Sequence, residues 1–346
     1  MVHEAQYPVF LRANARCFRG NEQNSSKLLG PTQYIMPAVN DTKFQPAVFL
    51  LTGIPGLEDI HVWIFIPFCL MYVISILGNS VILFIIKTDP SLHEPMYIFL
   101  SMLAVTDLSL SLCTLPTTLG VYWFHSREIS HDACFAQVFF IHSLTLIESS
   151  VLLSMAFDRF VAICNPLRYA SILTPPRIAK MGLVSLLRGV ILILPLPILL
   201  KQHRYCKDSI LSQSFCRHSD ILTMACSDIS VDIIYGFFLT VSSRGLDLLL
   251  ILLSYVMIFK SVLSIACHGK RLKVLNTCVS HVCVVLLFYT PHIALSVIYR
   301  FVKNFSPILA IVLGNVYMLV PPLMNPIVYS VKTEAIRVRI IRVFVK

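Results

Sequence analysis

The segment "SMAFDRFVAICNPLRY", Ser154–Tyr169, ends a long apolar run with an acidic and a basic residue side by side, Asp158 and Arg159. In a water-soluble protein such a pair usually forms a solvent-exposed ion pair of little energetic value. Here the residues before the pair are mostly apolar or small as far back as Ala133, and a proline and a second arginine follow it. The meaning of the pair therefore depends on the apolar run that it ends.

That run is one of several. The chain has 346 residues, of which 56% are hydrophobic and 13% charged, and a soluble globule of this composition could not cover its apolar surface. A helix needs about 20 mainly apolar residues to cross about 30 Å of hydrocarbon. The composition predicts an all-α membrane protein, a seven-transmembrane helix bundle, with spans at roughly 62–86, 95–121, 133–164, 178–200, 231–264, 272–299 and 307–331.

The chain is expected to form one helical domain with a tail at each end. Residues 1–61 would be an N-terminal tail, 62–331 the transmembrane domain and 332–346 a short basic cytoplasmic tail. A more compact start at Met36 predicts that residues 1–35 are a dispensable extension. The first 30 residues lack a continuous apolar segment, so we expect no secretory signal, and the first span would direct membrane insertion.

The formal charge of +10 is better explained by the distribution of basic residues around membrane spans than by nucleic-acid binding. The Lys and Arg residues lie between apolar spans, and no basic surface with interleaved aromatic residues emerges. An extracellular N-terminus is favoured because most of the basic residues that it places outside fall in the N-terminal segment and the long loop, where the positive-inside bias has less weight. Glycosylation sequons at Asn24, Asn40 and Asn304 all fall on the proposed outer side. We expect a multi-pass plasma-membrane protein.

Four cysteines meet on that outer side. Cys206, Cys216 and Cys226 follow one another at intervals of ten in the long loop, and Cys134 opens the third span. Four cysteines allow three pairings, and spacing alone does not choose between them. A bridge from the third helix to the loop would hold the loop over the mouth of the bundle. Free thiols or metal ligands are the alternative.

Two carboxylic acids lie near the middle of their spans, Asp107 and Glu148. A charge inside the membrane costs about 2.5–3.5 kcal/mol on insertion scales, so each raises a functional hypothesis. Facing inward, the two could share a sodium ion or a proton, with no other cofactor expected. A protonated Glu148 that hydrogen-bonds to neighbouring Ser and Asn side chains is the structural alternative.

Two other polar groups are interpreted as structural. Arg244 and Asp247 are three residues apart in the fifth span, so one helical face carries both and we expect them to pair. Cys278, His281 and Cys283 lie within two turns of the sixth span. Because no second ligand cluster accompanies them, we expect helix packing there rather than a metal site.

The motifs now resemble a family. "MAFDRFVAICNPLRYASIL" is similar to the end of the third helix in odorant receptors, a branch of the rhodopsin-like G-protein-coupled receptors. "LHEPMYIFLSMLAVTDL", "LNTCVSHVCVVLLFYTP" and "PPLMNPIVYSVKT" support the resemblance, which covers about Phe49 to Lys346. The long loop and "LLTGIPGLE" resemble the class I, or fish-like, branch and its family 51.

This resemblance implies particular partners within the chain. Cys134 would pair with Cys216, and Cys206 with Cys226. Arg159, beside Asp158, would hold the third and sixth helices in the resting state and be released to a G protein on activation. A companion switch in the seventh helix would contain Asn325, Pro326 and Tyr329. Two departures, Phe160 and the charge of Arg244, suggest a receptor-like chain with impaired signalling as one alternative.

The resemblance also implies a function. An odorant receptor binds small volatile molecules in the outer half of the bundle and activates a stimulatory olfactory-type G protein to raise cAMP, typically in olfactory sensory neuron cilia. A membrane transporter is the alternative from another class, but the inverted repeats that it predicts are not seen. An enzyme is not expected, because the sequence has no phosphate-binding loop, nucleophile elbow or zincin motif.

The predicted ligand pocket starts from a stripe in the sixth span, Tyr289, His292, Ser296 and Arg300. A short or medium-chain carboxylic acid is the expected ligand, because class I receptors characteristically answer polar, often acidic, volatiles. Arg300 and Ser296 would hold its head, His142 would reach the same region from the third span, and the tail would contact Phe139, Leu146 and Phe288. In the alternative reading, Arg300 extends to lipid headgroups and His142 only hydrogen-bonds within the bundle.

Overall fold

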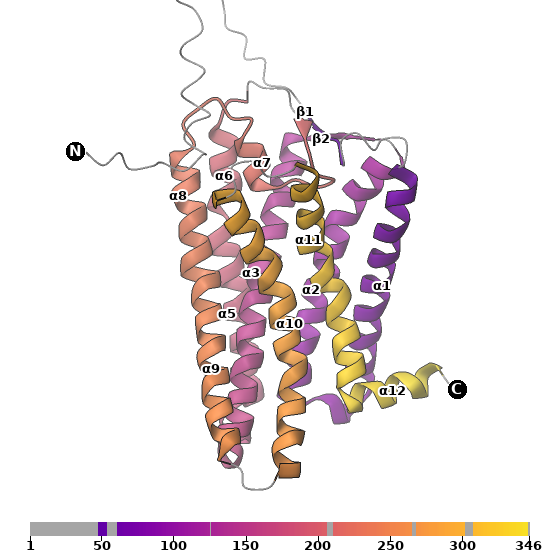
Figure 1. Ribbon diagram of the computed structural model, residues 1–346, viewed down its shortest axis with the longest axis vertical. Coiled ribbons are helices and arrows are strands. Elements are labelled where there is room, and N and C mark those ends of the chain that lie inside the picture. Colours follow the sequence, from indigo (N-terminus) through magenta and orange to yellow (C-terminus); the bar gives the residue numbers. More distant parts are fainter. Residues whose placement is uncertain are drawn as a thin grey trace, which may run out of the picture.

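A computed structural model describes residues 48–53, 61–124, 126–205, 210–264, 268–301 and 307–344. Within these residues, seven helical segments are long and apolar enough to cross a membrane, and they lie side by side as one bundle (Figure 1). The predicted fold class is confirmed. The spans consist of α1 (His61–Thr88), α2 (Pro95–Tyr122), α3 (His131–Cys164), α5 with α6 (Pro175–Ile193, Pro195–Gln202), α8 with η6 and α9 (Ser230–Leu239, Thr240–Gly245, Leu246–Leu263), α10 (His268–Phe301) and α11 (Pro307–Lys332).

Local sequence explains several helix boundaries. Pro95, Pro175 and Pro307 each open a helix, where a missing backbone N–H costs nothing. The Ser130 hydroxyl caps α3 by accepting a hydrogen bond from the Ala133 N–H, 3.3 Å away. The fourth span is divided at Pro195, which starts α6 because a proline cannot donate the next helical hydrogen bond.

The outer surface of the bundle is apolar. Exposed large hydrophobic side chains follow α1, α5 and above all α9, where they include Leu249, Leu252 and Phe259. Such a surface is stable only in lipid, where a helix satisfies its own backbone polar groups. Inside the bundle, α3 packs against α2, α5 and α9 and is therefore the central helix.

One end of the bundle carries a three-stranded sheet in the order β2-β1-β3. β1 (Val48–Leu51) pairs antiparallel with β2 (Glu128–Ser130) and parallel with β3 (Ile210–Leu211). After β1 the chain turns at Gly53, whose φ of +71° suits glycine. A Cβ there would lie 2.9 Å from the Tyr122 ring. We call this end, which also holds the Cys134–Cys216 disulfide, the disulfide end.

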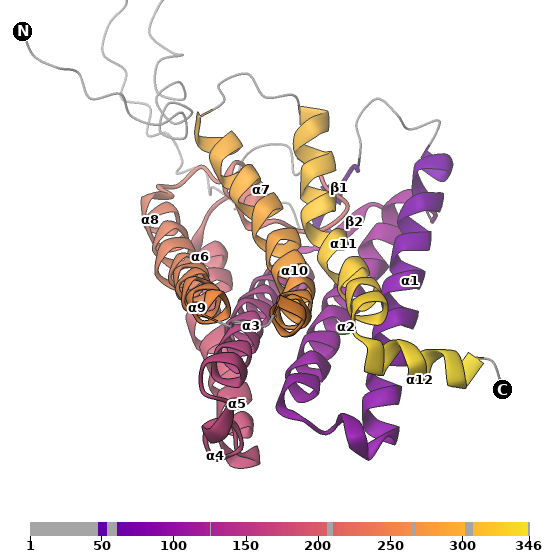
Figure 2. The same cartoon turned by 60° about the horizontal axis from the view of Figure 1, so that its bottom comes forward.

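The opposite end, called the Arg159 end, holds the short helices η4 (Pro90–Leu92), η5 (Pro166–Arg168) and α4 (Tyr169–Ile172). The predicted C-terminal tail is helical as far as it is described, as α12 (Glu334–Phe344), which turns away from α11 across the base of α1 (Figure 2). Arg339 attaches α12 to Asp89, which caps η4, at 2.5 Å and to Ser91 within η4 at 2.8 Å. Residues 1–47, with Asn24, Asn40 and the expected extension, lie outside the described residues, as does Asn304.

Candidate ligand-binding and coupling sites

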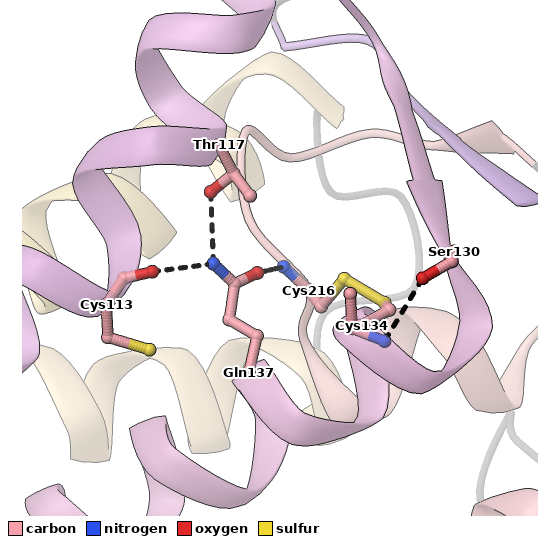
Figure 3. The surroundings of a disulfide bond; sticks show 7 residues. Cys113, Thr117, Ser130, Cys134, Gln137 and Cys216 are labelled. Atoms are coloured by element: carbon pink, nitrogen blue, oxygen red, sulfur yellow. Dashed lines mark hydrogen bonds between the residues drawn. A yellow bond between two sulfur atoms is a disulfide. The ribbon is translucent and has the colours of Figure 1, made fainter.

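The long loop is attached to α3 at two points in the disulfide end. Cys134 and Cys216 form a disulfide, the pairing that the family resemblance implies, with Cα atoms 5.5 Å apart. Gln137, one turn along α3, accepts a hydrogen bond from the Cys216 N–H at 2.8 Å and donates to Cys113 and Thr117 on α2, both at 3.0 Å (Figure 3). Cys226 is also in a disulfide; its expected partner, Cys206, lies outside the described residues.

A histidine cluster includes residues of this loop. His203 contacts Asp232 at 2.7 Å and Ser227 at 2.6 Å. His218, on the short helix α7 (His218–Leu222), lies 3.9 Å from the other oxygen of Asp232. Burial lowers the pKa of His218 to about 4, with nearby His203 acting in the same direction and the Asp232 carboxylate opposing it. The His218 ring also meets the ring of His142 on α3, with 6.2 Å between centroids.

Deeper in the bundle, the fifth span presents a cation. Residues Thr240–Gly245 form a π-helical turn, η6, a feature that often marks functional sites. It holds Arg244, which is buried, with Nη1 at 3.1 Å from both ring nitrogens of His292 on α10. His142 interacts electrostatically with Arg244. The π turn therefore brings Arg244 together with His292 and His142, which the sequence placed in the region of the ligand pocket. No residue motif predicted this backbone feature.

The other predicted pocket residues are only partly gathered there. The Ser296 hydroxyl donates to the His292 carbonyl oxygen at 2.9 Å, within its own helix. Phe139 and Leu146 pack with residues of α6 and α8, including Leu239, whereas Phe288 belongs to a separate cluster nearer the Arg159 end. The side chain of Arg300 is not among those described, so its predicted role stays a prediction.

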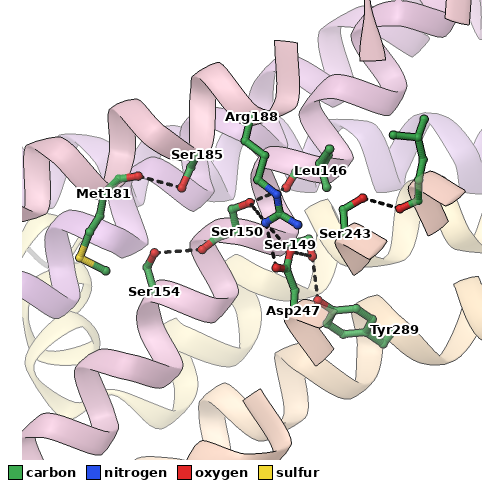
Figure 4. A network of polar contacts seen from close by, with 11 residues as sticks. Leu146, Ser149, Ser150, Ser154, Met181, Ser185, Arg188, Ser243, Asp247 and Tyr289 are labelled. Atoms are coloured by element: carbon green, nitrogen blue, oxygen red, sulfur yellow. Dashed lines mark hydrogen bonds and ion pairs between the residues drawn. The ribbon is translucent and has the colours of Figure 1, made fainter. Parts of the chain in front are cut away.

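Below Arg244, a polar network connects α3, α5, α9 and α10 (Figure 4). Arg188 Nη1 lies 2.8 and 2.9 Å from the two oxygens of Asp247 and donates to Ser150. Ser149 donates to Asp247 at 2.7 Å and contacts the Tyr289 hydroxyl at 2.8 Å. Sequence reasoning missed Arg188, although an arginine in the middle of an apolar segment was a visible signal.

The expected pairing of Arg244 with Asp247 is therefore wrong. A regular α-helix would place residues three apart on one face, but the π turn ends between these two. Arg244 consequently meets α10, while Asp247 meets α3 and α5. The partner of Asp247 comes from the fourth span rather than from its own helix.

Three oxygen-bearing side chains meet at the predicted cation site. Asn325 on α11 donates to Asp107 on α2 at 3.0 Å, and Glu148 on α3 interacts electrostatically with Asp107. One oxygen of each of Asp107, Glu148 and Asn325 is buried without a hydrogen-bond partner. Uncompensated buried oxygens of this kind are the ligands that a hard cation prefers. The structure thus brings the two predicted carboxylates together and adds the Asn325 amide.

At the Arg159 end, Asp158 is completely buried and holds Arg159 beside it, at 2.8 Å from Nε. The Tyr169 hydroxyl donates to the other Asp158 oxygen at 2.8 Å; burial and this carboxylate raise the pKa of Tyr169. Within the described side chains, the hydrogen bonds of Arg159 go to Asp158, and none reaches α10. The proposed connection between the third and sixth helices therefore stays a prediction.

The neighbouring switch residues are buried in the core of the Arg159 end. Tyr329 is completely buried beside Met155 on α3, and the Pro326 ring lies 3.0 Å from where a Cβ on Gly78 would be. Phe160 packs against Ile258 and Cys278. His281, in the sixth span, contacts Tyr255 at 2.6 Å. Among the described residues, no group of three or more His, Cys, Asp or Glu side chains is arranged to hold a metal ion.

The comparisons with known proteins agree with these features. The features are seven spans, a loop anchored to the third span, and a buried Asp158 paired with Arg159 at the other end. A family model described as "Olfactory receptor" matches residues 68–346. The chain belongs to the olfactory receptor family. Human olfactory receptor 51G2 is 61% identical over 305 residues, 88% of this receptor and 97% of that protein. Human olfactory receptor 51G1 is 55% identical over 309 residues, 89% and 96% of the two chains.

The fold comparison agrees. The receptor matches the crystal structure of squid rhodopsin with a TM-score of 0.67 over 84% of this receptor and 87% of rhodopsin, at 18% identity, which shows a shared fold alone. The family 51 resemblance is confirmed, and membership favours a receptor over a transporter. The receptor is a multi-pass membrane protein that signals rather than catalyses, with a small-molecule odorant and a G protein as partners.

Proposed function

We propose that the receptor binds small carboxylic acids in the disulfide end and activates a stimulatory olfactory-type G protein, raising cAMP in the cilia of olfactory sensory neurons. The observation that carries this proposal is the polar interior beneath the long loop, where His142, Arg244 and His292 meet. A basic interior bounded by apolar Phe139 and Leu146 suits a molecule with an anionic head and a hydrocarbon tail. The disulfide end faces outward, and α12 lies on the cytoplasmic side.

The test is a cAMP assay in cells that express the receptor with an olfactory-type stimulatory G protein. Straight-chain acids from propanoic to decanoic are compared with primary alcohols and aldehydes of equal length. We expect saturable responses to a subset of the acids, with weaker responses to the alcohols. Arg300→Ala tests the predicted role of that residue at the mouth of the site. A receptor that reaches the surface and answers only neutral compounds would contradict the acid assignment.

Coupling is proposed to depend on Arg159, since it lies beside buried Asp158 at the end opposite the ligand. Arg159→Ala should abolish the cAMP response while surface expression is kept, because the guanidinium would no longer be available to the G protein. Phe160→Tyr, which restores the usual family residue, is the matched control and should keep or increase the response. A normal agonist response from Arg159→Ala would argue against this role.

We further propose a sodium ion at Asp107, Glu148 and Asn325 that favours the resting state. The support is the set of three unpartnered buried oxygens from α2, α3 and α11, which a monovalent cation would satisfy. Replacing sodium by a large organic cation should raise basal activity in the wild type and leave Glu148→Gln unchanged. If wild type and Glu148→Gln respond to sodium alike, Glu148 serves packing only.

A further inference from the structure

Arg244 is buried but has no carboxylate partner among the described residues, unlike three less buried arginines. Arg159, Arg188 and Arg217 each contact an aspartate. Arg244 takes part in none of the ion pairs found among the described residues. Its residue is only 9% exposed. Removing a guanidinium from water without a counter-charge is costly, so this position calls for an anion.

The neighbours of Arg244 do not supply that anion. A neutral imidazole has one acceptor nitrogen, so His292 can accept only one of the five N–H groups of a guanidinium, although both ring nitrogens lie at 3.1 Å from Nη1. His142 is a further imidazole rather than an acid. Glu148 interacts with Arg244 electrostatically but lies beyond ion-pair distance, at the cation site with Asp107.

The guanidinium of Arg244 is also not completely enclosed. Hydrogen bonds to described residues involve only its Nη1, yet neither Nε nor Nη2 is among the fully enclosed polar atoms without a partner. His292, which contacts Arg244, and His142, which interacts with it electrostatically, are likewise only half-buried. The Nε and Nη2 edge of Arg244 is thus neither paired with a described residue nor completely enclosed.

We infer that Arg244 is a carboxylate-binding residue, gripping the anionic head of the ligand through its unpaired edge deep in the bundle. This inference rests on the proposed function and deepens it, because it assigns the head group to the fifth span. Two parallel charge-assisted hydrogen bonds form between a guanidinium and a carboxylate. The hydrocarbon tail then lies against Phe139, Leu146 and Leu239, which pack together between α3, α6 and α8.

The experiment compares Arg244→Gln and Arg244→Lys with wild type and with Arg300→Ala. Acids from propanoic to decanoic and their matched primary alcohols are tested for cAMP potency and, with purified receptor in detergent, for thermal stabilisation. The second measurement detects binding without signalling. Arg244→Gln should lower acid potency roughly 10- to 100-fold, the value of charged hydrogen bonds, and leave alcohol potency unchanged. Arg244→Lys should keep part of the acid response.

The outcomes separate this inference from the function that it deepens. If wild type answers acids and Arg244→Gln answers them equally well, or if acids and alcohols weaken together, Arg244 is a packing residue and the inference fails while the acid assignment stands. If wild type answers only neutral odorants and no acid stabilises it, both fail. Loss of acid stabilisation in Arg244→Gln, with alcohol stabilisation kept, supports the inference even where signalling is weak.

Discussion

Two arginines inside the bundle, Arg188 and Arg244, have opposite surroundings. Arg188 contacts both oxygens of Asp247 through its Nη1 atom, supported by serines on α3. Arg244 faces two imidazoles and has an unpaired edge. A buried ion pair contributes to a defined arrangement of helices, and its breakage leaves an uncompensated charge. An unpaired buried cation is instead available to a ligand. The partner of a buried charge, rather than its residue type, therefore indicates its role.

The largest expected effect comes from making Arg188 resemble Arg244. Asp247→Asn removes the carboxylate and leaves Arg188 unpaired, which should destabilise the fold by about 3–5 kcal/mol. Thermal unfolding in detergent, followed with a thiol-reactive dye that reports exposure of buried Cys278, measures the change. Replacing both partners, Arg188→Met with Asp247→Leu, should recover most of the lost stability. Equal stability of Asp247→Asn and wild type would show that the pair is not important for folding.

The reverse change gives Arg244 a partner. His292→Glu places a carboxylate next to the guanidinium, since His292 already lies at 3.1 Å. The internal carboxylate should compete with acidic ligands and lower their potency by about tenfold or more. His292→Gln is the control of similar size without the charge, and cAMP dose–response curves for acids and alcohols provide the measurement. Undiminished acid potency in His292→Glu would show that Arg244, like Arg188, is not available to an acidic ligand.

The same contrast between paired and unpaired groups appears in two histidines. His203 contacts Asp232 and Ser227, whereas His218 lies 3.9 Å from Asp232. The pKa of His218 falls from 6.5 to about 4 on folding, so the folded state binds fewer protons and stability rises with pH between these values. Lowering the pH from 7 to 5.5 should cost about 1 kcal/mol through this residue. His218→Gln should flatten the pH dependence of the melting temperature, and an unchanged slope would refute this assignment.

The smallest effect is expected for a partly exposed pair at the Arg159 end. Arg339 and Asp89 are each 27% exposed in their side chains, and hydrogen bonds from Ser91 and Arg339 hold the pKa of Asp89 well below its usual range. Arg339→Ala should lower the melting temperature only slightly, and added salt should reduce even that change. A large loss would mean that solvent exposure does not weaken this pair.

Sequence was sufficient for the parts of the receptor that depend on apolar length and local motifs. The seven spans differ from the observed helices by a few residues at each end, because a helix in lipid has to be apolar over a known length. Asp107 and Glu148 were found as charges without local partners, and they do meet. Such features follow from short-range pattern and from the cost of burial.

The partners of Asp247 and Arg244 depended instead on helix rotation, which the sequence does not report. The π turn changes which face each residue presents, so spacing along the chain predicted the wrong pair. For the same reason Phe288 was grouped with Leu146, although they pack in different clusters. A contact between spans is decided by how whole helices pack, and this can be read only after the fold is known.

The sheet at the disulfide end can be completed only late in the synthesis of the chain. β1 pairs with β3, and the Thr52 hydroxyl binds the Leu211 carbonyl oxygen, 159 residues later in the chain. At about 5–20 residues per second, the ribosome takes roughly 8–30 seconds to supply that partner. Until then β1 has only β2 beside it, and its other edge presents unpaired backbone groups to chaperones and neighbouring chains. Closure of this sheet therefore marks a nascent chain whose first four spans are complete.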